Sequence, residues 1–231
     1  MGMKQAICRF IYYKVLGWKT RVTIPDYPKY VICCGPHTSN WDLFFGKLFH
    51  AAIGRKTQFM MKKEWFFSPL GPMFRAIGGI PVNRGKRNSL VDQMVEACNQ
   101  SEIFHLAITP EGTRKANPNW KKGFYHIALK AGVPIVVIGI DYSRKLIICE
   151  KELFPSGDIE KDMREIKLYM KDFKGLHPEN FTVGNVWSRE SNLLYPIFSF
   201  FLMPSLSFWR RKHLNTCAWY LLMFAFTDSS L

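Results

Sequence analysis

Acidic residues are scarce in this chain, and their scarcity sets the net charge. Of 231 residues, 18 are Asp or Glu and 32 are Lys or Arg, so the formal net charge at pH 7 is +14. Such an excess attracts anionic partners, whether nucleic acid, anionic lipid or a phosphorylated substrate. Aromatic residues make up 15% of the chain. Positive charge together with many aromatic side chains favours a bilayer surface over a nucleic acid, and we expect no nucleic-acid partner.

Cysteine pairs, metal-ligand spacings and targeting signals are also missing. The six cysteines form no C-x-x-C pair, so we expect reduced thiols in a cytosolic environment. No cluster of His, Cys and Asp has the spacing of a metal site. The first 16 residues lack the apolar core of a signal peptide, and Ala6 stands where N-myristoylation favours Ser or Thr. We therefore predict a protein that is not exported and has no lipid anchor and no metal.

Residues 1–24 form a basic N-terminal segment without acidic residues. On a helical projection five apolar side chains share one side, although Lys14 interrupts their stripe and would have to snorkel. The five are Met3, Ile7, Phe10, Ile11 and Trp18. Two interpretations stay open: an interfacial helix on an anionic membrane, or a first helix packed on the core with a solvated basic face.

Between residues 25 and 190, apolar strand-like runs alternate with helical ones, which is the pattern of an α/β domain. We predict strands at residues 30–35, 58–61, 79–83, 103–109, 134–141 and 146–149. We predict helices at residues 41–53, 89–98, 121–131 and 158–173, and a Pro/Gly-punctuated connection at residues 68–72.

Residues 191–231 form a hydrophobic C-terminal tail. The apolar run at residues 193–209 contains two prolines and falls just short of a comfortable membrane span, and the run at residues 214–226 is shorter. The tail is either a pair of interfacial or re-entrant segments or an appendage packed on the domain.

A histidine and an aspartate stand five residues apart at a predicted strand-to-helix junction. The segment is GPHTSNWD (residues 35–42), with His37 and Asp42 as its titratable groups. A turn at the start of the helix can fold the carboxylate back onto the imidazole. The carboxylate would then fix the tautomer and raise the basicity of the other ring nitrogen, which suits a general base. The alternative is a helix-capping segment with a satisfied histidine.

Two further segments place arginines just after predicted strands. TPEGTR (residues 109–114) offers backbone donors, a carboxylate and Arg114 in one turn, and GIPVNR (residues 79–84) ends on Arg84. Ligands of open α/β sheets collect at strand ends, and two neighbouring arginines can clamp one phosphate. A solvated arginine in an ordinary turn is the alternative for each.

Four blocks occur in a recognisable order: H-x₄-D (residues 37–42), GIPVNR, PEGTR (residues 110–114) and VPIV (residues 133–136). Together they resemble the four motifs of the lysophosphatidate (1-acylglycerol-3-phosphate) acyltransferase family over about residues 25–145. Thr109 departs from the usual Phe, and Val137 and Ile138 stand where a second Pro is common. The resemblance implies a glycerolipid-acyltransferase-like mixed sheet flanked by helices, with the basic N-terminal helix and the hydrophobic tail as additions.

The resemblance also implies roles for individual residues. His37 would be the general base, and Asp42 would orient it. The glycerol-phosphate part of the acceptor would be held by Arg84, Glu111, Gly112, Thr113 and Arg114, with Lys62 and Lys63 as further candidates for phosphate contact. No cofactor and no metal are implied.

The implied activity belongs to phospholipid biosynthesis. A fatty acyl group would move from acyl-CoA or acyl carrier protein to a lysophospholipid, most simply 1-acylglycerol-3-phosphate, at the cytoplasmic face of the cell membrane. One alternative is an acceptor without phosphate, such as a lyso-aminolipid, since an arginine pair does not prove a phosphate. Another is a non-catalytic module that binds anionic lipid or nucleic acid.

Overall fold

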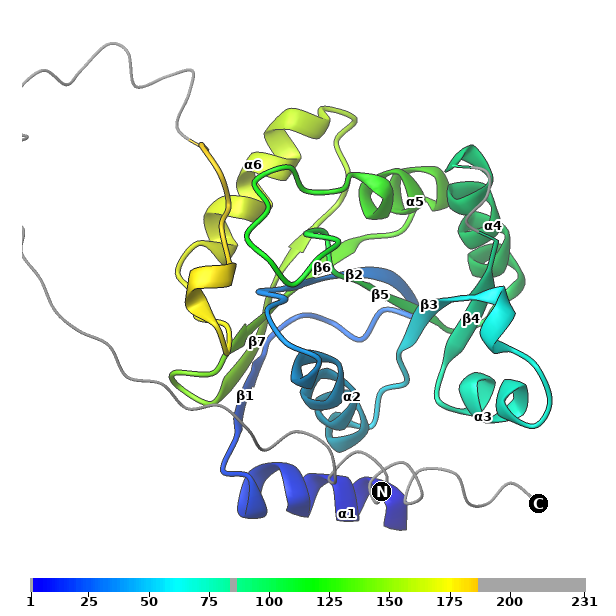
Figure 1. Cartoon of the computed structure of the whole chain (residues 1–231), viewed down its shortest axis with the longest axis vertical. Coiled ribbons are helices and arrows are strands. Elements are labelled where there is room, and N and C mark those ends of the chain that lie inside the picture. The colour runs from blue at the N-terminus through cyan, green and yellow to red at the C-terminus, as the bar shows by residue number, and fades with distance from the viewer. Residues whose placement is uncertain (1, 84–86, 187–231) are drawn as a thin grey trace, which may run out of the picture. The chain divides into compact units, whose positions relative to one another are not determined.

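A seven-stranded mixed β-sheet forms the centre of the protein, described here from a computed structural model for residues 2–83 and 87–186 (Figure 1). The order across the sheet is β1-β7-β6-β2-β5-β3-β4, and every neighbouring pair is parallel except β6 and β7. The strands are β1 (Lys19–Val22), β2 (Lys29–Gly35), β3 (Gln58–Lys62), β4 (Gly79–Val82), β5 (Phe104–Ile108), β6 (Ile135–Asp141) and β7 (Leu146–Leu153). The carboxyl ends of β6, β2, β5, β3 and β4 therefore meet at one edge.

Helices cover both faces of this sheet. Figure 1 shows α5 and α6 on one face and α2 on the other, with α1 beside α2. The α-helices are α1 (Met3–Phe10), α2 (Trp41–Ile53), α3 (Leu70–Ala76), α4 (Arg87–Gln100), α5 (Gly123–Ala131) and α6 (Ile159–Met170). A π-helical turn, η1 (Ile11–Val15), extends α1, and two 3₁₀ turns complete the set, η2 (Lys63–Trp65) and η3 (Pro178–Asn180).

The strand β2 illustrates how the sequence builds the core. Successive side chains of a strand point to opposite faces. Val31 and Cys33 belong to the core cluster on the face of α5 and α6, while Tyr30 stacks on His105 with the ring centroids 4.1 Å apart. Both faces of β2 are buried, so it reads as a continuous apolar run, as parallel central strands do. This central position puts the residues that follow β2 at the middle of the sheet edge.

The predicted α/β class and mixed sheet are confirmed, and the helix predicted at residues 41–53 is confirmed with both ends unchanged. The N-terminal prediction needs a correction. The helical segment ends at Val15, Gly17 has a φ of +67°, and Lys19–Val22 forms the edge strand β1 beside β7. Trp18 is accordingly buried against Phe45 and does not share a face with the stripe.

A second correction concerns residues 68–72, predicted as a connection. The helix α3 begins at Leu70, so Pro72 lies in its first turn. A proline is tolerated there because the first amides of a helix have no intrahelical acceptor. The Pro/Gly pattern of residues 68–72 therefore belongs to the start of a helix and not to a connection.

Some predictions fall outside the described residues, namely those on Arg84 and on the tail at residues 191–231. Within the described ranges, no helix is long and apolar enough to cross a bilayer. The five cysteines in these ranges are all free thiols: Cys8, Cys33, Cys34, Cys98 and Cys149.

Candidate active site

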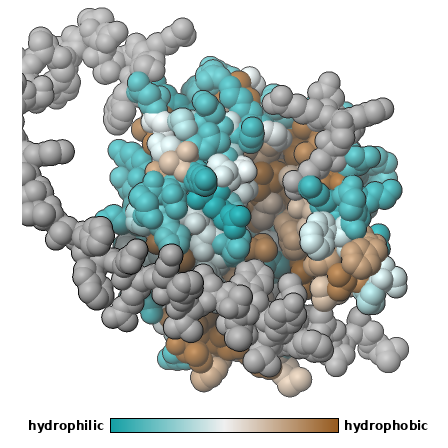
Figure 2. All heavy atoms as spheres, in the orientation of Figure 1, coloured by the Kyte–Doolittle hydropathy of each residue, from teal (hydrophilic) through white to brown (hydrophobic). Residues whose placement is uncertain are grey.

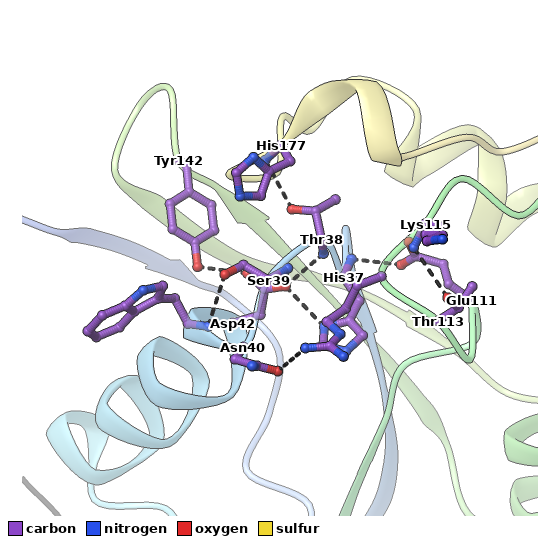
Figure 3. Close-up of polar contacts among 12 residues, drawn as sticks. His37, Thr38, Ser39, Asn40, Asp42, Glu111, Thr113, Lys115, Tyr142 and His177 are labelled. Atoms are coloured by element: carbon purple, nitrogen blue, oxygen red, sulfur yellow. Dashed lines mark hydrogen bonds and ion pairs between the residues drawn. The ribbon is translucent and has the colours of Figure 1, made fainter. Parts of the chain in front are cut away.

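The loop between β2 and α2 holds the predicted pair, and its geometry matches the sequence expectation (Figure 3). The imidazole Nδ1 of His37 lies 3.0 Å from Oδ2 of Asp42. The same oxygen accepts hydrogen bonds from the backbone N–H groups of Thr38 at 2.8 Å and Ser39 at 2.9 Å. The expectation that the carboxylate folds back onto the ring is confirmed.

This arrangement prepares the imidazole to accept a proton. The side chain of Asp42 is 4% exposed and that of His37 is 22% exposed, so a buried carboxylate supports a ring that reaches solvent. A carboxylate accepts from Nδ1–H, which leaves Nε2 as the basic nitrogen. Asp42 also ties the loop to the first turn of α2, where negative charge is favoured.

Tyr142 completes the set of groups around Asp42. Its hydroxyl donates to Oδ1 of Asp42 at 2.7 Å. No sequence motif points to Tyr142, because it lies 100 positions after Asp42 and directly follows β6. Only the parallel pairing of β2 with β6, which aligns Gly35 with Gly139, brings the two loops together.

Glu111 lies beneath the histidine loop. Its Oε1 accepts a hydrogen bond from the backbone N–H of His37 at 2.8 Å, and the residue is 1% exposed. Its Oε2 has no hydrogen-bond partner among the described residues. Burial raises the pKa of Glu111 to about 7, although the His37 N–H opposes this rise. Glu111 thus supports the loop from inside, while its predicted contact with the acceptor stays a prediction.

The approach of Glu111 to β2 depends on a glycine. A Cβ built on Gly35 would lie 3.2 Å from Oε1 of Glu111 and 3.0 Å from the sulfur of Met170. Both contacts are tighter than ordinary van der Waals packing. A side chain at residue 35 would therefore displace the carboxylate that holds the His37 amide.

The rest of the PEGTR segment forms the exposed loop after β5. Gly112 has a φ of +67°, a conformation that favours glycine. Arg114 reaches across to the start of α2, where its Nη1 donates to Oδ1 of Asn40 at 2.5 Å. The hydroxyl of Thr113 accepts from the N–H of Lys115 within the loop. The guanidinium of Arg114 is thereby placed at the loop that carries His37.

A pocket of about 350 Å³ opens at the ends of the two outer strands. Lys63 follows β3 and Asn83 follows β4, and Arg75 reaches the pocket from α3 with its guanidinium 5.5 Å from the centroid of the Phe66 ring. The full lining is Lys63, Phe66, Arg75, Pro81, Asn83 and Gln93. Lys62 is exposed at the end of β3 and is not among these residues. Arg75 was not predicted from the sequence, because the helix α3 that carries it was predicted as a connection.

The structure thus brings the predicted residues to one sheet edge, in two groups. His37, Asp42, Glu111 and Arg114 lie around the β2–α2 loop, and Lys63 lies in the outer pocket. Over residues 2–83 and 87–186 we find no group of three or more His, Cys, Asp or Glu side chains that could hold a metal ion.

Comparisons with known proteins show which family the chain resembles. A family model described as "Acyltransferase" matches residues 20–141, just over half of the chain. The 1-acyl-sn-glycerol-3-phosphate acyltransferase of Haemophilus influenzae is 25% identical over 182 residues, which cover 69% of this chain and 74% of that protein. The enzyme of the same name from Limnanthes alba is 33% identical over 114 residues, 47% of this chain and 40% of the plant protein.

Among solved structures, the 1-acyl-sn-glycerophosphate (LPA) acyltransferase PlsC from Thermotoga maritima is similar with a TM-score of 0.49 and 19% identity. The match covers 72% of this chain and 76% of that one.

Proposed function

This chain belongs to the acyltransferase family, and we propose that it transfers a fatty acyl group from an acyl thioester to the free hydroxyl of 1-acylglycerol-3-phosphate, giving phosphatidate. The observation that carries the proposal is the His37–Asp42 hydrogen bond at the end of a central parallel strand. The names of the Haemophilus and Limnanthes relatives support the choice of acceptor. Acyl-CoA and acyl carrier protein are the two candidate donors.

The geometry supports a direct transfer. Nε2 of His37 takes the proton of the acceptor hydroxyl, and the oxygen attacks the thioester carbonyl, forming the new C–O bond. The tetrahedral intermediate collapses by breaking the C–S bond, and the imidazolium returns its proton to the leaving thiolate. Asp42 stabilises the imidazolium while it exists. Because a thiolate leaves readily, the reaction needs no covalent acyl-enzyme.

Cationic side chains along the sheet edge fit the acceptor phosphate. Arg114 lies beside the His37 loop through its bond to Asn40, and Lys63 and Arg75 line the outer pocket. Guanidinium and ammonium groups are the usual phosphate ligands of proteins. We place the phosphate of the acceptor against these charges, with the hydroxyl toward His37. We therefore add Arg75 to the phosphate ligands that the sequence leads us to expect.

The N-terminal helix fits a membrane surface. On α1 the apolar side chains of Met3, Ile7 and Phe10 are exposed by 81%, 53% and 61%, while Cys8 on the opposite side is buried. The basic residues Lys4, Arg9 and Lys14 are also exposed around this stripe. Figure 2 shows hydrophobic residues on the surface where α1 lies. An apolar stripe with cationic flanks is the pattern of a helix that lies in the interface of an anionic leaflet, so we propose peripheral membrane attachment through α1.

A panel of substrates tests the proposal. Purified protein is mixed with acyl-CoA or acyl carrier protein thioesters and with lysophosphatidate, lysophosphatidylcholine or a lyso-aminolipid, and released thiol and lipid product are measured. We expect thiol release with lysophosphatidate and phosphatidate as the product. A clear preference for the acceptor without phosphate would reject the phosphatidate assignment, and no transfer to any acceptor would reject the enzyme activity itself.

A further inference from the structure

The two carboxylate oxygens of Asp42 accept hydrogen bonds from different parts of the protein. Oδ2 receives three hydrogen bonds, all from residues 37–39 of the β2–α2 loop, which is the catalytic loop of the proposed function. Oδ1 receives the hydroxyl of Tyr142 at 2.7 Å, a donor from the opposite side (Figure 3). Asp42 is buried, and a carboxylate oxygen without a donor would be costly there. The Tyr142 hydroxyl is thus the contact that the structure provides for Oδ1.

Tyr142 is held firmly on its own side. Its ring meets the ring of Trp18 edge to face at a centroid distance of 5.2 Å and that of Phe45 at 5.6 Å. Its backbone N–H donates to the carbonyl of Lys174 at 2.9 Å. Burial, together with the charge of Asp42, raises the pKa of Tyr142 above its ordinary value, so the hydroxyl keeps its proton and donates.

We propose that Tyr142 is a positioning residue of the acyl-transfer reaction: its hydroxyl fixes the Asp42 carboxylate and moderates how strongly that carboxylate accepts from His37. The proposal rests on the proposed function. Tyr142 does not touch the substrate in this role, since it acts through Asp42. The ring packing against Trp18 and Phe45 fixes the hydroxyl in place, and a phenylalanine at this position keeps that packing while removing the one donor.

The sign of the effect follows from the charge on Asp42. Without the Tyr142 donor, the carboxylate concentrates its charge on the remaining contacts and accepts more strongly from Nδ1–H of His37. The imidazolium that forms during the transfer is then stabilised relative to the neutral ring. Glu111, whose pKa is raised to about 7 beneath the same loop, is present in both the wild type and the variant and so does not account for a difference between them. The acidic limb of the kcat profile should move to higher pH in the variant, and the loss of kcat should shrink as the pH rises. A merely structural defect lowers kcat by a similar factor at every pH.

The matched control is Tyr125→Phe. The hydroxyl of Tyr125 also donates to a buried carboxylate, Oδ2 of Asp162, at 2.8 Å. Both variants delete one oxygen atom from a tyrosine whose hydroxyl donates to a buried aspartate, although Tyr142 is half-buried and Tyr125 is buried. The contact of Tyr125 joins α5 to α6 and includes no residue of the catalytic loop.

Two readouts test the proposal on the full chain. In Tyr142→Phe the acidic limb of kcat should move up by about one pH unit, with kcat on that limb about tenfold lower and KM within about twofold. The proton NMR resonance of the His37 Nδ1–H, assigned by its loss in His37→Gln, should move downfield. Tyr142→3-fluorotyrosine, a stronger donor, should move the same resonance upfield. Tyr125→Phe should change neither readout.

An unmoved resonance and pH profile in Tyr142→Phe, or the same changes in Tyr125→Phe, would overturn the proposal. The NMR readout needs no turnover. If the wild-type protein acylates no acceptor, the proposed function fails while the resonance still decides whether Tyr142 acts on the His37–Asp42 pair.

Discussion

The backbone N–H of His37 donates to the carboxylate of Glu111, two residues that are 74 positions apart and only 2.8 Å from donor to acceptor. The contact fastens the β2–α2 loop to the loop after β5, the neighbour of β2. Since Glu111 is buried, its ionisation is opposed by desolvation, and its pKa is about 7 in place of the ordinary 4.5. A group that supports the histidine loop therefore changes its charge near neutral pH.

Glu111→Gln should remove a pH dependence from stability. A raised carboxyl pKa means that the folded state binds the proton more tightly than the unfolded chain. Glu111 thus contributes most to the stability of the folded state below about pH 4.5. This contribution is lost as the pH rises through about 7. The difference in free energy of unfolding between Glu111→Gln and wild type should shift in favour of the variant over this range, by on the order of 3 kcal/mol.

Denaturant unfolding at a series of pH values from 4.5 to 8 measures this difference. Glu160→Gln is the control, because that side chain is 77% exposed. A difference between Glu111→Gln and wild type that stays constant over the series would show that Glu111 does not titrate in this range.

Asp42→Asn should reduce kcat strongly and destabilise the loop. The amide keeps the shape of the carboxylate, but it cannot hold the imidazolium by charge. Its one oxygen can accept either from the N–H groups of Thr38 and Ser39 or from the Tyr142 hydroxyl, so the donors on one side lose their acceptor. We expect kcat to fall by about 10² to 10⁴ and the free energy of unfolding to fall by about 1–3 kcal/mol. Thiol release and denaturant unfolding measure the two effects. A variant with nearly wild-type kcat would exclude Asp42 from the mechanism.

Lys63→Ala and Arg75→Ala should each weaken acceptor binding. Both remove a positive charge from the outer pocket, so KM for lysophosphatidate should rise about tenfold while kcat changes little. The control is Lys56→Ala, because Lys56 is an exposed lysine just before β3, whereas Lys63 follows the same strand at its other end. Equal KM values in the pocket variants and the control would show that the phosphate does not bind in this pocket.

Phe10→Ser should weaken binding to anionic vesicles. The substitution removes one large apolar side chain from the exposed stripe of α1, and we expect roughly tenfold weaker partitioning in a flotation assay with phosphatidylglycerol-containing vesicles. Phe154→Ser is a closely matched control, since Phe154 is 60% exposed and Phe10 is 61% exposed. Loss of flotation in both variants, or in neither, would contradict attachment through α1.

The local pattern of the sequence predicts much of this fold. Continuous apolar runs give the buried strands β2 and β6, and the polar residues before Trp41 mark the start of α2. The edge strand β1 escapes prediction because Lys19 and Arg21 alternate with half-buried residues, and a short basic segment of this kind also suits a helix. Its strand conformation comes from pairing with β7, which no local pattern contains.

Part of the candidate site can likewise be predicted from the sequence, and part of it depends on how distant segments pack. The sequence identifies His37 and Asp42, because their spacing and their motif lie within one loop. It cannot identify Tyr142, since only the pairing of β2 with β6 brings that residue to Asp42. For Glu111 the sequence indicates a place near the site, but the contact with the His37 amide depends on how two loops pack.

A thiol-release assay on His37→Ala tests whether His37 is the base of an acyl transfer. The control is His126→Ala, which removes an exposed histidine from α5. With an acyl thioester and lysophosphatidate, we predict that His37→Ala loses acyl transfer by at least about 10² to 10⁴ while remaining folded, and that His126→Ala retains the wild-type rate. Wild-type turnover in His37→Ala would rule out His37 as the base.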